Sequence, residues 1–132
     1  MSAHDTLGDF LTLLRNASRA HKETAETFHS NAREGILRIL KEGGYIRNYQ
    51  VIETEGSFKR LRIEMKYVND VPSLTDIQRA SKPGRRRYCG SREVPKVLGG
   101  MGNSILTTPK GILNEREARR LKVGGELICT VW

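Results

Sequence analysis

The chain has 132 residues and carries 23 Lys and Arg against 15 Asp and Glu, which gives a formal net charge of +8. This length fits one domain or two small lobes that share an interface. The longest apolar runs are far shorter than the roughly 18 residues that a membrane helix needs, and the N-terminus lacks a basic and then apolar leader. Cys89 and Cys129 are 40 positions apart and form no Cys-x-x-Cys pair. We therefore expect a cytoplasmic protein with reduced thiols and no membrane association, whose positive charge attracts a polyanion.

The positive charge is concentrated in the second half of the chain. Residues 1–69 hold 11 basic and 9 acidic side chains, a net charge of +2, whereas residues 70–132 hold 12 basic and 6 acidic ones, a net charge of +6. Residues 79–92, here called the basic segment, contain no acid and six bases, namely Arg79, Lys82, Arg85, Arg86, Arg87 and Arg92. Such a run either solvates an exposed edge or attracts nucleic-acid phosphates whatever their sequence.

Two amphipathic helices are predicted in the first half. Apolar residues at i, i+3, i+4 and i+7 within residues 7–14 predict the first helix. Arg15 and Asn16 are expected at its C-terminal end, where a cation suits the helix dipole. Asn31 and Glu34 are expected to form the capping pair that begins the second helix, which should end at a following Gly-Gly pair.

The remaining segments are mostly extended. In the first half, strands are predicted at residues 24–28, 45–52 and 58–67, the last two forming a hairpin. Residues 69–73 are the expected boundary between an N-terminal lobe (1–68) and a C-terminal lobe (74–132). The C-terminal lobe should contain strands at 74–80, 85–89, 104–107, 111–113 and 126–132, a helical turn at 93–98 and a capped helix at 114–121. We predict an α+β fold with an α/β N-terminal lobe and a mostly β C-terminal lobe that has short helices.

The sequence shows no catalytic constellation. The three histidines have no metal-ligand spacing among themselves or with the cysteines, and each is expected at the surface. The glycine cluster at residues 99–102 is expected to be a flexible turn, because no Gly-Lys-Ser/Thr follows it. A metal-dependent nuclease would need convergent carboxylates, and no spacing forces together Asp70, Asp76, Glu93 and Glu126. We predict no enzymatic activity, no metal and no cofactor, with such a nuclease as a minor alternative.

Polar residues that suit nucleic-acid recognition occur at a predicted strand junction. Thr107 and Thr108 supply adjacent hydroxyls, Lys110 supplies a charge, and Gly111 supplies a permissive backbone. Hydroxyls can bond a ribose or a base edge, and a lysine can contact a phosphate. Tyr88, among the arginines, could stack on an exposed base. The plainer interpretations are strand propensity for the threonines and a half-buried strand position for the tyrosine. Together these residues favour RNA over DNA only slightly.

Ordered blocks of the sequence resemble a known family. They are residues 77–84 (IQRASKPG), 87–88 (RY), 94–97 (VPKV), 107–111 (TTPKG) and 124–129 (GGELIC), with further similarity at 9–16 and 40–46. These blocks resemble the bacterial family of ribosomal protein S8 of the small subunit. The resemblance covers essentially the whole chain. It implies a two-lobed, non-enzymatic protein that binds a helical stem in the central domain of 16S rRNA early in assembly.

The resemblance also implies site residues. The family's Ser-Thr-Ser-Lys-Gly turn, which enters an RNA minor groove, corresponds to residues 107–111, where Pro109 lacks both a hydroxyl and an N–H. The family's glutamate before the last strand corresponds to Glu126, which is expected to brace that turn. The family's Pro-Ser-Ser-Lys corresponds to residues 29–32, and Arg33 follows in place of the lysine. The expected RNA-binding residues are Thr107, Thr108, Lys110, Gly111, Tyr88, Arg85, Arg87, Ser30, Asn31, Arg33, Arg15 and Asn16.

These observations lead to one functional prediction and one main alternative. We predict a structural component of the small ribosomal subunit that binds 16S rRNA directly and lies beside other small-subunit proteins. It is expected to be a monomer outside the ribosome. The alternative is a general double-stranded RNA-binding module without sequence preference.

Overall fold

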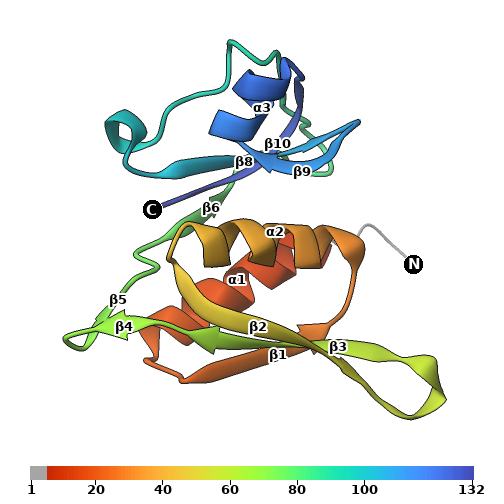
Figure 1. Cartoon of the computed structure of the whole chain (residues 1–132), viewed down its shortest axis with the longest axis vertical. Helices are drawn as coiled ribbons and strands as arrows, with labels where there is room; N and C mark the ends of the chain where they lie inside the picture. The colour runs from red at the N-terminus through yellow and green to blue at the C-terminus, as the bar shows by residue number, and fades with distance from the viewer. Residues whose placement is uncertain (1–5) are drawn as a thin grey trace.

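The computed structural model describes residues 6–132, and His4 therefore lies outside the described residues. The N-terminal half contains a three-stranded antiparallel sheet in the order β1-β3-β2. Its elements are α1 (Thr6–Arg19), β1 (Thr24–Phe28), α2 (Asn31–Glu42), β2 (Ile46–Glu53), the 3-10 turn η1 (Glu55–Ser57) and β3 (Lys59–Met65). Both helices lie between this sheet and the C-terminal half (Figure 1). None of the helices among the described residues is long and apolar enough to span a membrane.

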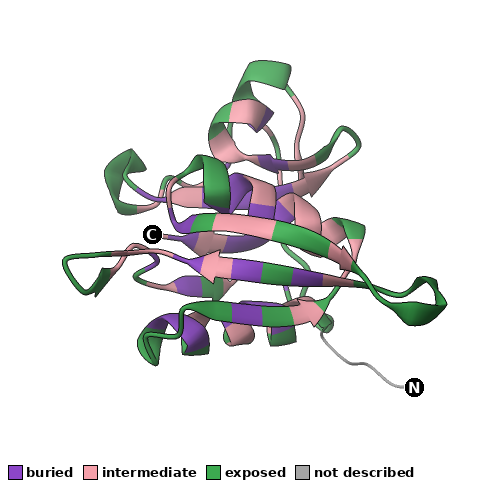
Figure 2. Cartoon of the chain, turned by 60° about the horizontal axis from the view of Figure 1, so that its bottom comes forward, coloured by how far each residue is buried: buried purple, intermediate pink, exposed green. Residues whose placement is uncertain are grey.

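The central strand of this sheet follows the predicted alternation. Leu61, Ile63 and Met65 of β3 are buried, whereas the residues between them are more exposed (Figure 2). The buried face packs against the apolar faces of the helices, including Phe10 of α1 and Leu37 of α2. A strand with one face on the core and one toward solvent is expected to alternate in this way.

The C-terminal half contains a second antiparallel sheet in the order β6-β10-β8-β9, with β7 also paired to β10. Its elements are β6 (Ile77–Arg79), β7 (Tyr88–Cys89), the 3-10 turn η2 (Leu98–Gly100), β8 (Asn103–Thr108), β9 (Gly111–Asn114), α3 (Glu115–Leu121) and β10 (Gly125–Val131). The capping box of α3 forms as predicted, because Asn114 and Glu117 each accept the other's backbone N–H. The α+β prediction is confirmed.

A short hairpin joins the two halves. Its strands are β4 (Tyr67–Val68) and β5 (Val71–Pro72), and its turn contains Asn69 and Asp70 with φ of 52° and 63°. Asn and Asp tolerate this left-handed conformation better than most residues, because their short side chains can hydrogen-bond locally. Much of the expected boundary at residues 69–73 therefore belongs to a hydrogen-bonded hairpin.

The apolar core continues from one half into the other. The larger cluster combines N-terminal residues such as Leu14 and Leu40 with Ile77, Ile105 and Val131 of the C-terminal sheet. A smaller cluster fills the opposite face of that sheet beneath α3 and consists of Val94, Leu106, Ala118 and Leu127. The C-terminal sheet is thus covered on one face by α1 and α2 and on the other by α3, so the two halves hold each other in place.

Two predictions for the N-terminal helices are wrong in detail. Helix α1 continues to Arg19, because Ala17 and Ser18 extend its buried stripe and the Ser18 hydroxyl donates to the Leu74 carbonyl at 2.7 Å. Arg15 and Asn16 therefore lie within the helix and not at its end. The N-cap of α2 is Ser30, whose hydroxyl accepts the Arg33 N–H at 3.1 Å, so Asn31 is already helical and forms no capping pair.

Three C-terminal segments also differ from prediction. Residues 93–97 form no helix, because Val94 is buried in the smaller cluster and the Pro95 carbonyl accepts the Ser104 hydroxyl, and Leu98 belongs to η2. The predicted strands at 74–80 and 85–89 are reduced to Ile77–Arg79 and Tyr88–Cys89. Ahead of β6, the Thr75 and Asp76 N–H groups both donate to the carbonyl of Trp132, one residue beyond β10.

Candidate nucleic-acid interface

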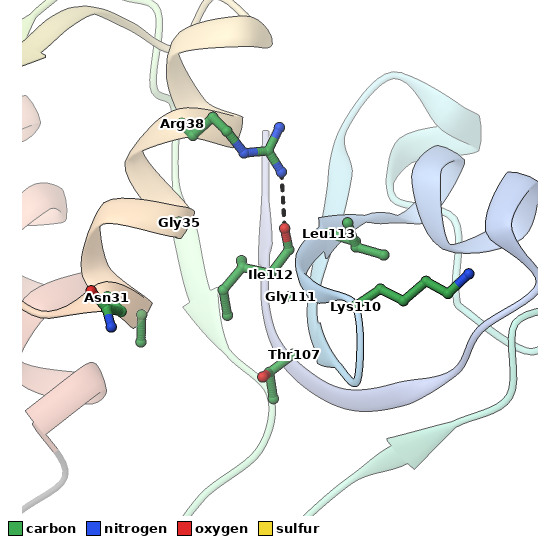
Figure 3. A pocket seen from close by; sticks show the side chains of 9 residues that line it. Asn31, Gly35, Arg38, Thr107, Lys110, Gly111, Ile112 and Leu113 are labelled. Atoms are coloured by element: carbon green, nitrogen blue, oxygen red, sulfur yellow. Dashed lines mark hydrogen bonds between the residues drawn. The ribbon is translucent and has the colours of Figure 1, made fainter.

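A groove of about 480 Å³ joins the start of α2 to the β8–β9 hairpin. Nine residues line this groove, namely Asn31, Ala32, Gly35, Arg38, Thr107, Lys110, Gly111, Ile112 and Leu113 (Figure 3). Four of these residues were predicted from the sequence, and they come from two distant segments. One wall is helical and the other is a hairpin, so a ligand in the groove would contact both halves of the protein.

The tip of the hairpin is closed by a threonine hydroxyl. The Thr108 hydroxyl donates to the Gly111 carbonyl at 2.9 Å and accepts the Lys110 N–H at 3.1 Å. Pro109 costs this turn no hydrogen bond, because the N–H that the turn uses belongs to Lys110. Gly111 has φ of 108°, a conformation that only glycine adopts readily.

The two threonines face opposite sides of the hairpin. Successive strand residues alternate, and Thr107 pairs with Ile112, which lines the groove, whereas Thr108 does not line it. The Lys110 side chain extends from the hairpin away from α2 (Figure 3). Thr107 therefore offers its hydroxyl to the groove, and Lys110 is free to reach a phosphate beyond it.

Three strands meet closely beside the hairpin. Glu126 of β10 pairs with Thr107 of β8 on one side and with Tyr88 of β7 on the other, so these three side chains share a face. A Cβ on Gly125 would lie 2.0 Å from the Thr107 carbonyl oxygen, and one on Gly124 would lie 2.3 Å from the Cys89 carbonyl oxygen. Only glycines can occupy these two positions, and they allow β10 to sit between β7 and β8.

Glu126 supports the basic segment. Its carboxylate accepts hydrogen bonds from the Ser81 hydroxyl and from Arg86 Nη1, the latter at 2.8 Å. The Ser81 oxygen also accepts the Arg87 N–H at 3.2 Å. Burial opposes ionisation of Glu126, but these donors and the charges of Arg86 and Arg79 lower its pKa overall. The contacts of this carboxylate thus order residues 81–87, and its bracing of the 107–111 turn stays a prediction.

Several other residues of the basic segment face solvent. Lys82, Arg85 and Arg87 are exposed, and Tyr88 is 71% exposed. Tyr88 is therefore not the half-buried strand residue of the plainer interpretation. An exposed ring between arginines has the chemistry for stacking on a base or a ribose.

Two predicted arginines of the N-terminal half are bound within the protein. The Arg33 guanidinium donates to the Thr27 hydroxyl at 2.6 Å and to the Phe28 and Thr6 carbonyls at 3.2 and 3.0 Å. Burial lowers its pKa, against the raising effect of Asp9. Arg15 donates to Asp76 Oδ1 at 3.1 Å and to the Ile77 carbonyl.

These arginines tie elements together and do not line the groove. Arg33 links α2 to β1 and to the start of α1, and Arg15 links α1 to β6. Asn16 is exposed but lines a different cleft, between α1 and β1. Of the N-terminal candidates, the groove includes Asn31, and Ser30 caps the helix that carries it.

Comparison with known proteins identifies the family. The family model for ribosomal protein S8 matches residues 5–132. The chain belongs to the ribosomal protein S8 family. The small ribosomal subunit protein uS8 of Paracoccus denitrificans is 46% identical over 132 residues, and that of Chloroflexus aurantiacus is 47% identical over 133 residues. The uS8 of Dictyoglomus thermophilum is 46% identical over 132 residues, and each comparison covers 100% of both chains.

Membership of the S8 family establishes the class of function. The chain is a structural, non-enzymatic component of the small ribosomal subunit, where it assembles with rRNA and other ribosomal proteins.

Among residues 6–132, no group of three His, Cys, Asp or Glu side chains could hold a metal ion. Cys89 and Cys129 are free, and burial raises the pKa of the Cys129 thiol to about 12, although the charge of Arg79 acts the other way.

Sequence reasoning missed five residues of the groove, namely Ala32, Gly35, Arg38, Ile112 and Leu113. A glycine inside a helix costs about 1 kcal/mol relative to alanine, so Gly35 could have been recognised as a point of close approach. Arg38 and Ile112 follow the ordinary patterns of a helix surface and a strand. Nothing local in the sequence distinguishes them.

Proposed function

We propose that this S8-family chain binds a helical stem in the central domain of 16S rRNA, as a monomer that enters the cytoplasmic small subunit early in its assembly. The observation that carries the proposal is the groove, in which Asn31 of α2 lies opposite Thr107, Lys110 and Gly111 of the hairpin. A surface made from both halves can recognise the shape of a folded stem, which a lone basic patch cannot do.

The chemistry of the groove suits the minor groove of an RNA helix. That groove is wide and shallow and displays 2′-hydroxyls and base edges. The Thr107 hydroxyl and the Asn31 amide can donate to and accept from these groups. Gly111 has no side chain and nothing within 4 Å of its Cβ position, so RNA can approach the backbone there.

Phosphate contacts would come from Lys110 and from exposed arginines of the basic segment. Lys110, Arg85 and Arg87 are exposed and form no ion pair within residues 6–132. Each phosphate that a cation neutralises releases a counterion, which makes binding depend on salt. Tyr88, next to these arginines, would stack on an unpaired base.

We also propose that residues 1–68 and 74–132 act as two lobes joined at 69–73. Each half has its own sheet, and the β4–β5 hairpin lies between them. The remaining surface of either lobe is available to other small-subunit proteins.

A salt titration tests the proposal. Affinity is measured for the cognate ribosomal stem-loop and for a duplex of equal length without the unpaired bases. We expect a preference for the stem-loop that persists as salt rises. Equal affinities that fall together with salt would contradict specific recognition and would favour a general double-stranded RNA-binding module.

Two lysine variants, one a test and one a matched control, extend the same titration. Lys110→Ala should reduce the slope of log affinity against log salt by about 0.7–0.9, the contribution of one phosphate. Lys59→Ala removes another exposed charge, from β3 and outside the groove, and should leave the slope unchanged. Equal effects of the two variants would contradict a specific role for Lys110.

A further inference from the structure

We propose that Gly35 and Arg38 are positioning residues that fix the distance between the two walls of the groove and so determine its preference for a stem with unpaired bases. The inference rests on the proposed function. It concerns how the two RNA-binding walls are held, and neither residue needs to touch RNA for it to hold.

Gly35 lets the helix backbone contact the hairpin directly. A Cβ on Gly35 would lie 2.7 Å from Ile112 Cγ1 and 2.8 Å from Ile112 Cβ, closer than real Cβ contacts come. Ile112 is β-branched and half-buried in β9, so it cannot swing aside as a long flexible side chain would. Any side chain at position 35 must therefore move β9 away from α2.

Arg38, one turn further along the same face of α2, bonds to the other wall. Its Nη2 donates to the Ile112 carbonyl at 2.9 Å, as Figure 3 shows, and to Glu117 Oε1 at 3.3 Å. Its Nη1 donates to Glu42 at 2.9 Å. One guanidinium thus joins α2, the backbone of β9 and the first turn of α3.

Both contacts lie next to the residues that would meet RNA. Ile112 follows Gly111 directly, and Gly35 lies one helical turn after Asn31, so both contacts line the same groove. The spacing between Asn31 and the hairpin is set by these contacts before any RNA arrives. A preorganised site loses less conformational freedom on binding, and an RNA that fits both walls gains from simultaneous contact.

A change in this spacing should reduce selectivity without altering phosphate contacts. The stem-loop must fit both walls, whereas a plain duplex held by the exposed cations need not. Salt dependence reports the number of phosphates and not the fit of the groove. The ratio of the two affinities and the salt slope therefore separate a positioning role from a direct one.

The test compares Gly35→Ala, Arg38→Met and Arg38→Lys by the titration already described. For all three, we expect affinity for the stem-loop to fall about tenfold, affinity for the duplex to change less than twofold, and the salt slope to remain that of the wild type. Arg47→Met removes an exposed arginine outside the groove and is the matched control, with the wild-type preference retained. Circular dichroism verifies folding, and the Arg38 variants decide the question if Gly35→Ala does not fold.

Three results would overturn the inference. Variants that keep the wild-type preference would show that the groove width does not determine it. Equal losses for both RNAs would indicate general damage to the protein. A reduced slope in Arg38→Met that Arg38→Lys restores would make Arg38 a direct phosphate contact. If the wild type itself shows no preference, it is the proposed function that fails.

Discussion

The arginines predicted to bind RNA in the two halves have different surroundings, although they have the same chemistry. In the N-terminal half, Arg15 and Arg33 donate to backbone carbonyls and link elements that are distant in the sequence. In the basic segment, Arg85 and Arg87 are exposed at the end of a turn. Five donors in a fixed fork allow an arginine to act either as an internal cross-link or as a phosphate ligand. The difference teaches that a count of charges overstates the number of phosphate contacts.

Removal of an internal arginine should have the largest effect. Arg15→Met keeps the apolar stem but removes the charged donor to the half-buried Asp76 carboxylate and to the Ile77 carbonyl. We expect the free energy of unfolding to fall by about 2–3 kcal/mol, the size of hydrogen bonds to charged groups. Urea denaturation measures this, and Arg85→Met is the matched control that should change stability by less than about 0.5 kcal/mol. Similar losses of unfolding free energy in the two variants would contradict the distinction between internal and exposed arginines.

The exposed arginines should show the opposite behaviour. In Arg85→Ala/Arg87→Ala, we expect the salt slope of stem-loop binding to fall by about 1.4–1.8, which corresponds to two phosphates. Stability should change by less than about 0.5 kcal/mol. A salt titration and a urea denaturation of the same preparation measure both quantities. An unchanged slope would mean that these exposed arginines contact solvent and not RNA phosphates.

The hairpin tip offers a smaller test within the C-terminal half. Thr108→Val removes the hydroxyl that accepts from Lys110 and donates to Gly111, and should lower the free energy of unfolding by about 1 kcal/mol. Thr108→Ser keeps the hydroxyl and should retain most of this stability. If Thr108→Val were as stable as the wild type but bound RNA more weakly, the hydroxyl would contact RNA and would not close the turn.

The smallest expected effect concerns the pH dependence of stability that arises from the Arg38–Glu117 ion pair between α2 and α3. Burial opposes ionisation of Glu117, but the Asn114 N–H and the Arg38 guanidinium lower its pKa overall. A lowered pKa in the folded state adds stability above the unfolded pKa, and this stability is lost as the pH falls through the folded value. Glu117→Gln should therefore cost about 0.5–1 kcal/mol at neutral pH and progressively less below about pH 4. A constant difference between the two proteins from pH 7 to pH 3 would contradict this assignment.

Local patterns predicted most of the elements but not the contacts between them. The periodic apolar residues of α1 and β3 and the Asn114–Glu117 capping box follow from neighbours in the sequence, and they were predicted correctly. The position of Arg33 could not be inferred, because its partners Thr6 and Thr27 come together only when the helices pack on the sheet.

In the candidate site, too, individual residues could be predicted from the sequence, whereas the contacts between distant segments could not. Thr107, Lys110 and Gly111 were recognised from their chemistry at a strand junction and Asn31 with the help of the family resemblance, and the structure brings them into one groove. The contact between Gly35 and Ile112 depends on how α2 meets β9, which no short-range pattern encodes. The contacts of Glu126 with Ser81 and Arg86 could not be predicted, because these residues lie 45 and 40 positions away in the sequence.

The most direct test of the groove as the binding site is an NMR titration of the labelled protein with the stem-loop. The backbone amides of Asn31, Lys110 and Gly111 should shift with a single common midpoint, because one RNA contacts both walls at once. Shifts confined to the basic segment, with Asn31 and the hairpin unchanged, would contradict the account.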